Sequence, residues 1–282
     1  MDVGIGLPAM IPGVEGEQLV EWAKRADDAG FSTLGTLDRL VYPNYEPLVA
    51  LGAAAAVTER IRLTTAVLLL PWRDNAAFVA KQAATLHHLS GGRLVLGLAV
   101  GRREDDYEAS GSDFHDRGAR FERMLEQMES IWQGEKGIGP PLDTPPAVLI
   151  GGQVDAAFER AARYGAGWIM GGGTPDMLAE GRKKTEAAWQ EAGREGEPRV
   201  AALAYFALGE NAEQAAEKDL KHYYAWLGDD LAGQIAGSAA TDADTVNGYT
   251  EAFEQAGCDE LILFPTDPDP GQVDLLADVV LK

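Results

Sequence analysis

Residues 61–101 read IRLTTAVLLLPWRDNAAFVAKQAATLHHLSGGRLVLGLAVG. The segment from Ile61 to Leu70 is rich in apolar and β-branched residues and ends at Pro71, which predicts a buried strand. Ala76 to Leu89 has a helical pattern and ends before two glycines, which predicts a helix. Arg93 to Val100 is again typical of a buried strand. A strand, a helix and another strand in this order predict one βα repeat of a parallel sheet.

The same alternation continues on both sides of this segment. Six further strands are predicted at Val3–Leu7, Ser32–Leu37, Ala147–Ile150, Gly167–Met170, Val200–Leu208 and Glu260–Phe264. Further helices are predicted at Glu17–Ala29, Glu46–Thr58, Arg117–Trp132, Val154–Tyr164, Pro175–Ala192, Ala212–Leu227, Thr241–Ala256 and Gln272–Leu281. Each strand is therefore followed by at least one helix, and no change in composition divides the chain.

Eight βα units in 282 residues are the count of a closed (β/α)8 TIM barrel. The strands are continuous apolar runs, as expected of parallel strands that are covered on both faces. An open, doubly wound sheet is the alternative, but it usually has fewer strands. We therefore expect one barrel domain over residues 1–282, with insertions after strand 4 (Gly134–Pro146) and after strand 7 (residues 228–240).

Composition and charge narrow the class of protein. The chain has 46% hydrophobic residues, and its 24 Lys+Arg against 45 Asp+Glu give a net charge of −21. This charge argues against nucleic acids and anionic membranes as partners, because both bind clustered cations. Cys258 is the only cysteine, so no intramolecular disulfide is expected and the cytoplasm is the expected location. We expect neither a signal peptide nor a membrane span.

Two glycine-rich stretches follow predicted strands and precede predicted helices. They are Gly151-Gly152 and Gly171-Gly172-Gly173-Thr174. Active sites of such barrels lie at the carboxyl ends of the strands, often with a phosphate site in the later loops. Glycine lets the backbone approach an anion, and a helix N-terminus supplies N–H groups. The sequence therefore indicates phosphate binding, most of all at the second stretch, with tight-turn geometry alone as the alternative.

Several segments together carry a family resemblance. They are TERIRL (58–63), TAVLLLPWR (65–73), AKQAATL (80–86), LSGGRLVLGLAVG (89–101), IGG (150–152) and AARYGAGW (161–168). With these segments the chain resembles the bacterial luciferase-like family of flavin- and deazaflavin-dependent oxidoreductases. The resemblance covers nearly the whole chain, and residues 58–111 form its most specific block.

The resemblance implies a (β/α)8 barrel that holds reduced FMN, or the deazaflavin coenzyme F-420, at the strand carboxyl ends. It also implies a non-prolyl cis peptide bond between Ala66 and Val67. The cofactor-binding candidates are Ala66, Val67, Leu68, Ala99, Gly101, Gly151, Gly152, Gly171, Gly172, Gly173 and Thr174. The polyglutamate tail of F-420 calls for several cations, whereas the glycine loops contain no lysine. This difference favours FMN.

The end of strand 2 departs from the family pattern. Relatives often carry an acidic residue followed by a histidine that serves as acid or base, whereas this chain has Asp38-Arg39. Arginine stays protonated and cannot be a general base at neutral pH. We therefore expect Arg39 to stabilise a negative charge, and we name Asp38 with it as a catalytic candidate.

The end of strand 4 departs as well. Ala99 replaces the middle glycine of the family pattern, and Arg102 replaces an aromatic or acidic residue. Arg102 is the third catalytic candidate, since a cation here would bind an anionic substrate, a phosphate tail or a reduced flavin. The alternative is that Arg102 and Arg103 form ion pairs with acidic residues 104–106.

Candidate substrate-binding residues are Tyr42, Tyr107 and His115, which lie on loops after predicted strands. His87, His88 and His222 are interpreted as structural or solvated. The sequence has no metal-ligand spacing and no nucleophile motif, so we expect neither a metal site nor a serine-type triad.

The function expected from these residues and this resemblance is that of a two-component monooxygenase, in which reduced FMN and O₂ oxidise a small organic substrate. A separate flavin reductase is the expected partner. Alternatives are an F-420-dependent hydride-transfer enzyme, a non-redox phosphate-binding barrel enzyme, and a barrel that binds flavin without turnover. The resemblance also implies a homodimer formed through helices 2 and 3, where Ala53–Ala56 offers small residues.

Overall fold

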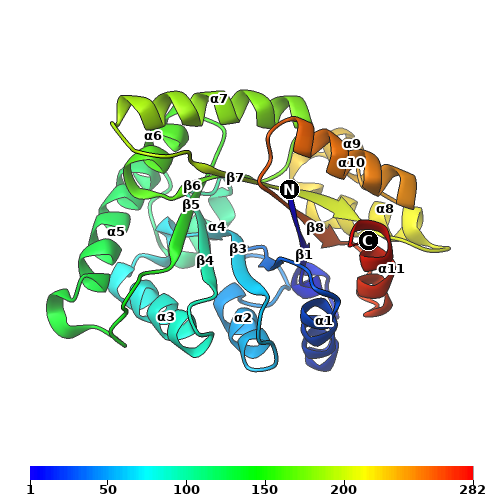
Figure 1. The fold of residues 1–282 in the computed structure, drawn as a ribbon, viewed down its shortest axis with the longest axis horizontal. Helices are drawn as coiled ribbons and strands as arrows, with labels where there is room; N and C mark the ends of the chain where they lie inside the picture. Colours follow the sequence, from blue (N-terminus) through cyan, green and yellow to red (C-terminus); the bar gives the residue numbers. More distant parts are fainter. Residues whose placement is uncertain (282) are drawn as a thin grey trace.

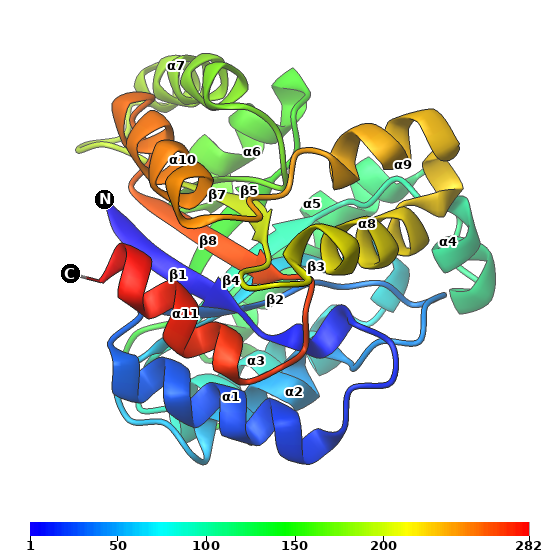
Figure 2. The same ribbon diagram turned by 90° about the vertical axis from the view of Figure 1, so that its right-hand side faces the viewer.

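The computed structural model describes residues 1–281 and confirms the predicted barrel. Eight parallel strands pair in chain order, and β8 closes the barrel on β1 (Figures 1 and 2). The strands are β1 (Asp2–Gly6), β2 (Thr33–Thr36), β3 (Arg62–Leu69), β4 (Leu94–Ala99), β5 (Ala147–Gly151), β6 (Gly167–Met170), β7 (Arg199–Phe206) and β8 (Glu260–Pro265).

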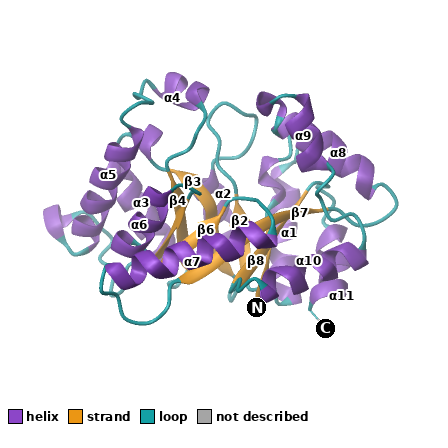
Figure 3. Cartoon of the chain, turned by 90° about the horizontal axis from the view of Figure 1, so that it is seen from above, coloured by secondary structure: helices purple, strands orange, loops and turns teal. Residues whose placement is uncertain are grey.

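Helices surround these strands (Figure 3). They are α1 (Gly16–Ala29), α2 (Pro47–Ala55), α3 (Ala76–Leu89), α4 (Glu104–Ser110), α5 (Arg117–Trp132), α6 (Asp155–Tyr164), α7 (Pro175–Glu191), α8 (Ala212–Tyr223), α9 (Asp229–Ala236), α10 (Ala243–Gln255) and α11 (Gly271–Val280). Four short 3-10 turns, η1 to η4, lie at Pro8–Met10, Pro71–Arg73, Glu135–Gly137 and Ala225–Leu227. No helix within residues 1–281 combines the length and the apolarity that a membrane crossing requires.

Two helices were missed by the sequence prediction. The chain forms α4 between β4 and α5, and the predicted insertion at residues 228–240 contains α9. The predicted helix at 212–227 ends earlier, at Tyr223, where the chain turns through η4. Both missed helices have only seven or eight residues and bury just two of them, so they carry almost no periodic pattern. Figure 3 shows α4, α8 and α9 at the end of the barrel opposite the N-terminus.

Charged side chains fill the barrel at the amino ends of its strands. Arg62 on β3 reaches Asp2 on β1 and Glu260 on β8, at 2.7 Å in both cases. Arg199 on β7 pairs with Glu260 at 3.0 Å. Because β3 and β8 are not neighbours, these ion pairs cross the interior of the barrel. They close the amino-terminal end of the barrel, which in this fold usually contributes to stability rather than to catalysis.

Phe264 fills the next layer of the interior. Strand residues alternate between the two faces, so Phe264 lies on the same inward face as Glu260. A Cβ on Gly6 would overlap the Phe264 ring, and a Cβ on Gly35 would come within 2.9 Å of its Cζ. The two glycines therefore make room for the ring. By the same alternation from Arg199, Tyr205 lies on the inward face of β7 near its carboxyl end.

The ion-pair network predicts a pH-dependent contribution of Glu260 to stability. Burial alone would raise the pKa of Glu260, but hydrogen bonds from Thr33 and charge from Arg62 hold it below its ordinary value of 4.5. Since the folded-state pKa is depressed, the stabilisation is present above about pH 4.5 and is lost as the pH falls through the folded-state pKa. We expect Glu260→Gln to lower the free energy of unfolding by about 2 kcal/mol at pH 7 and by much less at pH 3.

Urea unfolding at the two pH values measures this effect. The control is Glu254→Gln, which removes an exposed ion pair with the N-terminal amine and is expected to cost less than about 1 kcal/mol. Equal losses from Glu260→Gln at pH 7 and pH 3 would contradict the interpretation.

Candidate active site at the carboxyl ends of the strands

The end of β3 forms part of the floor of the barrel mouth. The peptide bond between Ala66 and Val67 is cis, and the pairing with β4 is interrupted between Thr65 and Leu68. A Cβ on Gly151 would lie 3.1 Å from Val67 Cγ1 and 3.2 Å from the Cβ of Ala99. The Val67 side chain therefore points inward, over positions where β4 and β5 carry small residues.

The predicted cofactor-binding residues of β3 differ in accessibility. Val67 keeps partial solvent exposure, whereas the side chains of Ala66 and Leu68 are buried. Leu37 after β2 and Leu69 on β3 are also partly exposed. The mouth is thus lined by apolar side chains that solvent reaches. Of the three β3 candidates, Val67 is the one whose side chain is available to a ligand.

The loop after β6 leaves its backbone bare. A Cβ added to Gly171 or Gly172 would meet no atom within 4 Å, so open space lies beside both residues. The φ angles of Gly172 and Gly173 are +109° and +147°, a region that glycine adopts without strain. Thr174 caps α7, since its hydroxyl accepts a hydrogen bond from the N–H of Met177 at 3.3 Å. The hydroxyl proton of Thr174 stays free to donate.

The glycine loops after β5 and β6 support each other. Trp168 on β6 donates its indole N–H to the carbonyl of Gly152 at 2.7 Å. Gln153 donates from Nε2 to the carbonyl of Gly172 at 3.0 Å. These bonds occupy carbonyl oxygens, which would repel an anion. An open loop at the N-terminus of a long helix, with the Gly172 carbonyl bonded to Gln153, fits a phosphate group.

Asp38 anchors the loop after β3. Its Oδ2 accepts hydrogen bonds from the N–H of Leu69 at 2.8 Å and from Arg73 at 3.0 Å. Arg73 also pairs with Glu46 at 3.0 Å. Burial raises the pKa of Asp38 to about 6, although the charge of Arg73 opposes the rise. The structure thus places Asp38 as a support of the mouth, while its predicted catalytic role stays a prediction.

Arg39 lies at the centre of an aromatic cluster. Its guanidinium donates to the carbonyl of Tyr223 at 2.7 Å, and its Cζ lies 4.3 Å from the ring centre of Tyr42 and 4.9 Å from that of Tyr223. The Tyr42 hydroxyl shares a 2.7 Å hydrogen bond with His222 Nδ1. The loop after β2 therefore meets the end of α8 above the barrel, and the structure brings the candidates Arg39 and Tyr42 together.

The two arginines after β4 have different partners. Arg103 is buried and forms ion pairs with Asp105 and Asp106, as in the alternative interpretation. Asp106 also accepts from the N–H groups of Leu40 and Val41. Arg102 is exposed and, among residues 1–281, forms no ion pair. Its guanidinium lies 5.0 Å from the ring centre of Trp226 in η4, so this charge remains available to a ligand.

Tyr107 and His115 lie apart from this cluster. Tyr107 is buried in α4, and its hydroxyl donates to the carbonyl of Val100. His115 is exposed on the loop between α4 and α5, where its ring packs 5.9 Å from that of Phe114. Their roles in substrate binding stay predictions.

Sequence reasoning missed three polar residues of the mouth. The hydroxyls of Tyr205 on β7 and Tyr224 after α8 lie 2.7 Å apart. Asp219 on α8 is buried, although its Oδ2 has no hydrogen-bond partner. The only early signal was the position of Asp219 on the apolar face of its helix, three residues after Ala216 and four before Tyr223.

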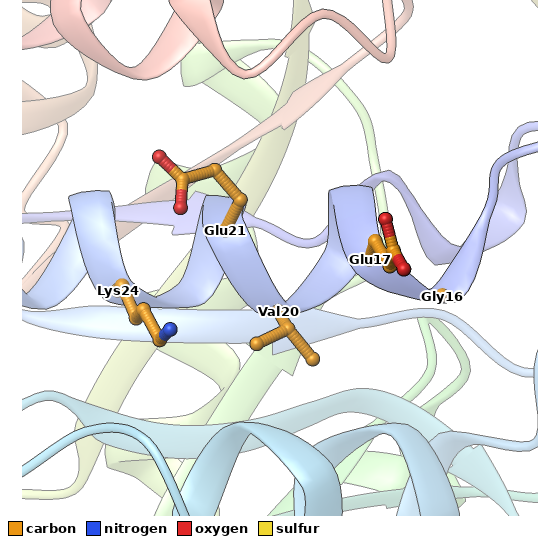
Figure 4. A pocket seen from close by; sticks show the side chains of 5 residues that line it. All are labelled: Gly16, Glu17, Val20, Glu21 and Lys24. Carbon is orange, nitrogen blue, oxygen red and sulfur yellow. The ribbon is translucent and has the colours of Figure 1, made fainter.

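Two surface hollows lie away from the mouth. One is lined by Gly16, Glu17, Val20, Glu21 and Lys24 along α1 (Figure 4). The other lies between α2 and α3 and is lined by Leu48, Val49, Gly52, Phe78, Lys81, Gln82, Thr85, Leu86 and Leu89. Neither contains a strand end. Residues 1–281 also contain no group of three or more His, Cys, Asp or Glu side chains placed to hold a metal ion.

Comparison with known proteins agrees with this geometry. An uncharacterized protein of Mycobacterium tuberculosis is 34% identical over 207 residues, which cover 61% of this chain and 71% of that protein. Pyrimidine monooxygenase RutA of Escherichia coli is 28% identical over 232 residues, which cover 72% of this chain and 58% of RutA.

The fold is also that of an F-420-dependent secondary alcohol dehydrogenase, solved in complex with an F-420–acetone adduct. The TM-score is 0.84 at 19% identity, with 99% of this chain and 98% of that chain covered. The model of the luciferase-like monooxygenase family matches residues 1–263. This protein is therefore an enzyme, and the chain belongs to the luciferase-like monooxygenase family.

Proposed function

We propose that this protein is the oxygenating component of a two-component monooxygenase, which uses reduced FMN and O₂ on a small organic substrate. One observation carries the proposal: the barrel is filled at the amino ends of its strands and lined by small or partly exposed apolar residues at the carboxyl ends of β3 to β5. A flat ring requires such a surface, and the bare backbone of residues 171–174 fits the phosphate of its tail.

The ring and the phosphate of FMN would be held by different segments of the chain. Val67, Ala99, Gly101 and Gly151 would contact the ring, and the loop from Gly171 to Thr174, with Gly152 beside it, would hold the phosphate. When bound, reduced flavin supplies the two electrons that activate O₂. The protein itself provides the apolar surroundings that exclude water and the charges that orient the substrate.

Arg39 and Tyr42 would act on the substrate by charge and hydrogen bonding. Arg39 stays cationic at neutral pH, even though burial lowers its pKa, and it would stabilise a negatively charged oxygen. Burial raises the pKa of Tyr42 to about 12, so its hydroxyl remains protonated and able to donate. Arg102, which follows β4 and lies over Trp226, adds a second cation for an anionic group.

The alternative is hydride transfer with F-420, the coenzyme named in the solved dehydrogenase of the same fold. Its polyglutamate tail calls for several cations beside the loops. The segments 151–153 and 171–174 contain none, which supports FMN.

Titration with each cofactor, followed by a coupled assay, tests the function. We expect FMN to bind and F-420 to bind more weakly. With a flavin reductase and NADH added, we expect less free peroxide per NADH consumed when a substrate is present and oxygenated than when it is absent. Pyrimidines are the first substrates to screen, because RutA is named for them. Binding of F-420 alone would contradict the proposal in favour of hydride transfer, and binding of neither cofactor would contradict both.

Charge placed at the glycine loop tests the phosphate site. Gly171 has open space around it and is exposed, so Gly171→Asp and Gly171→Ala are both expected to fold normally. Because an added carboxylate repels phosphate, we expect Gly171→Asp to weaken FMN binding at least about tenfold, while Gly171→Ala changes it little. Fluorescence titration gives the dissociation constants. The same affinity in both variants would place the phosphate elsewhere.

We further propose a homodimer formed through α2 and α3, working in the cytoplasm. Of the predicted small-residue surface Ala53–Ala56, Ala54 and Ala55 are buried against the barrel, whereas Ala53 and Ala56 are exposed. Nearby, Val49, Phe78 and Leu89 are 68%, 59% and 70% exposed around the hollow between α2 and α3. Exposed apolar side chains grouped in this way mark an interaction surface.

Light scattering tests the dimer. We expect Phe78→Glu to shift the protein from dimer to monomer, because a charge would be buried in the interface. Leu275→Glu on α11, also an exposed apolar position, is the control and should leave the dimer intact. A monomeric unmodified protein, or a dimer that survives Phe78→Glu, would contradict this interface.

A further inference from the structure

Asp219 is a buried acid without a partner. It is 7% exposed and lies on the face of α8 that also buries Ala216, Leu220 and Tyr223. Within residues 1–281 its carboxyl group forms no hydrogen bond and no ion pair, and its Oδ2 is enclosed. Burying an ionised carboxylate without a partner is costly, so such a group in a folded protein calls for an explanation.

Asp219 lies one helical turn before Tyr223 on the same buried face of α8. The Tyr223 ring packs against the rings of Tyr42 on the β2–α2 loop and Tyr224 after α8, at 5.1 and 4.9 Å between ring centres, and the Tyr224 hydroxyl bonds that of Tyr205 on β7. In agreement with this placement, the charge of Asp219 raises the pKa values of Tyr42, Tyr205 and Tyr224. These hydroxyls already have other partners: Tyr205 and Tyr224 bond each other, and Tyr42 bonds His222. Asp219 is therefore the group of this set left free for a ligand.

Few charges act on Asp219. Burial raises its pKa to about 7, and Lys218 on the same helix opposes the rise. The packed neighbour α9 carries Asp229 and Asp230, both exposed in its first turn, and η4 has no titratable side chain. An acid that is half protonated near neutral pH is suited to donate a proton and to regain it from solvent.

We propose that Asp219 supplies the proton consumed when O₂ is reduced at the barrel mouth. The inference rests on the proposed use of reduced FMN. The overall change is FMNH⁻ + O₂ + H⁺ → FMN + H₂O₂ in the absence of substrate. Two electrons and the N5 hydrogen leave the flavin, and the second hydrogen of the peroxide comes from the Asp219 carboxyl, which water then reprotonates. Arg39 cannot fill this role, because its guanidinium does not release a proton at neutral pH.

The first experiment asks whether the acid titrates as required, without any cofactor. Protein labelled with ¹³C at the aspartate carboxyl carbons is titrated by NMR. We expect one carboxyl signal to titrate near pH 7 in the unmodified protein and in Asp230→Asn, and to be missing from Asp219→Asn. If Asp219 titrates near pH 4 like an exposed aspartate, the inference is overturned, whatever the cofactor.

The second experiment follows the proton transfer. Photoreduced FMN bound to excess protein is mixed with aerated buffer in a stopped-flow instrument, and flavin absorbance is recorded from pH 5.5 to 8.5. We expect the rate to be constant below pH 7 and to fall about tenfold per pH unit above it, because only the protonated acid donates. Asp219→Asn should be at least about tenfold slower at pH 6 and should lose this inflection.

Matched variants separate this role from a structural one. Asp219→Glu retains an acid and should recover part of the rate with an inflection, and Asp230→Asn should behave like the unmodified protein. If FMN binds but Asp219→Asn keeps the rate and profile of the unmodified protein, the inference alone fails. If FMN does not bind to any variant, the proposed function fails and this inference fails with it.

Discussion

The interior of an eight-stranded barrel is only wide enough to be filled by its own side chains, so a ligand can enter only where those side chains are small. In this chain Arg62, Arg199 and Glu260 fill the amino end, and Phe264 fills the layer above, where Gly6 and Gly35 leave room for its ring. Beyond that layer, Ala99 and Gly151 leave Val67 as the main inward side chain of β3 to β5. The position of the site follows from this gradient of side-chain size.

The polar parts of the site come from outside the strands. Arg39 and Tyr42 belong to the β2–α2 loop, and they contact Tyr223 and His222 at the end of α8, which lies between β7 and β8. Arg102, after β4, lies 5.0 Å from the ring centre of Trp226 in η4. The end of α8 and η4 therefore bring together the loops after β2 and β4 above the mouth. A fixed barrel with a variable cover of this kind allows the substrate to differ among relatives while the cofactor surface stays the same.

The barrel could be predicted from the sequence because each buried parallel strand is a continuous apolar run. Glycines mark the ends of several of these runs, and both signals are local in the sequence. Helices α4 and α9 could not be predicted in this way, since helices this short bury too few residues to show a period. Among site residues, the glycines after β5 and β6 could be proposed from the sequence, because the role predicted for them depends on the backbone alone. The pairing of Arg103 with Asp106, and the isolation of Asp219, depend on side-chain directions between distant segments and have no signal in local spacing.

The central claim is that a flavin ring lies across the mouth with its phosphate against the backbone of residues 171–174. A crystal structure of the protein soaked with FMN tests it most directly. The account predicts ring density in contact with Val67 and Ala99, and phosphate density within hydrogen-bond distance of the N–H groups or the Thr174 hydroxyl of this loop. FMN density at the α2–α3 hollow or along α1, with the mouth free of ligand, would contradict it.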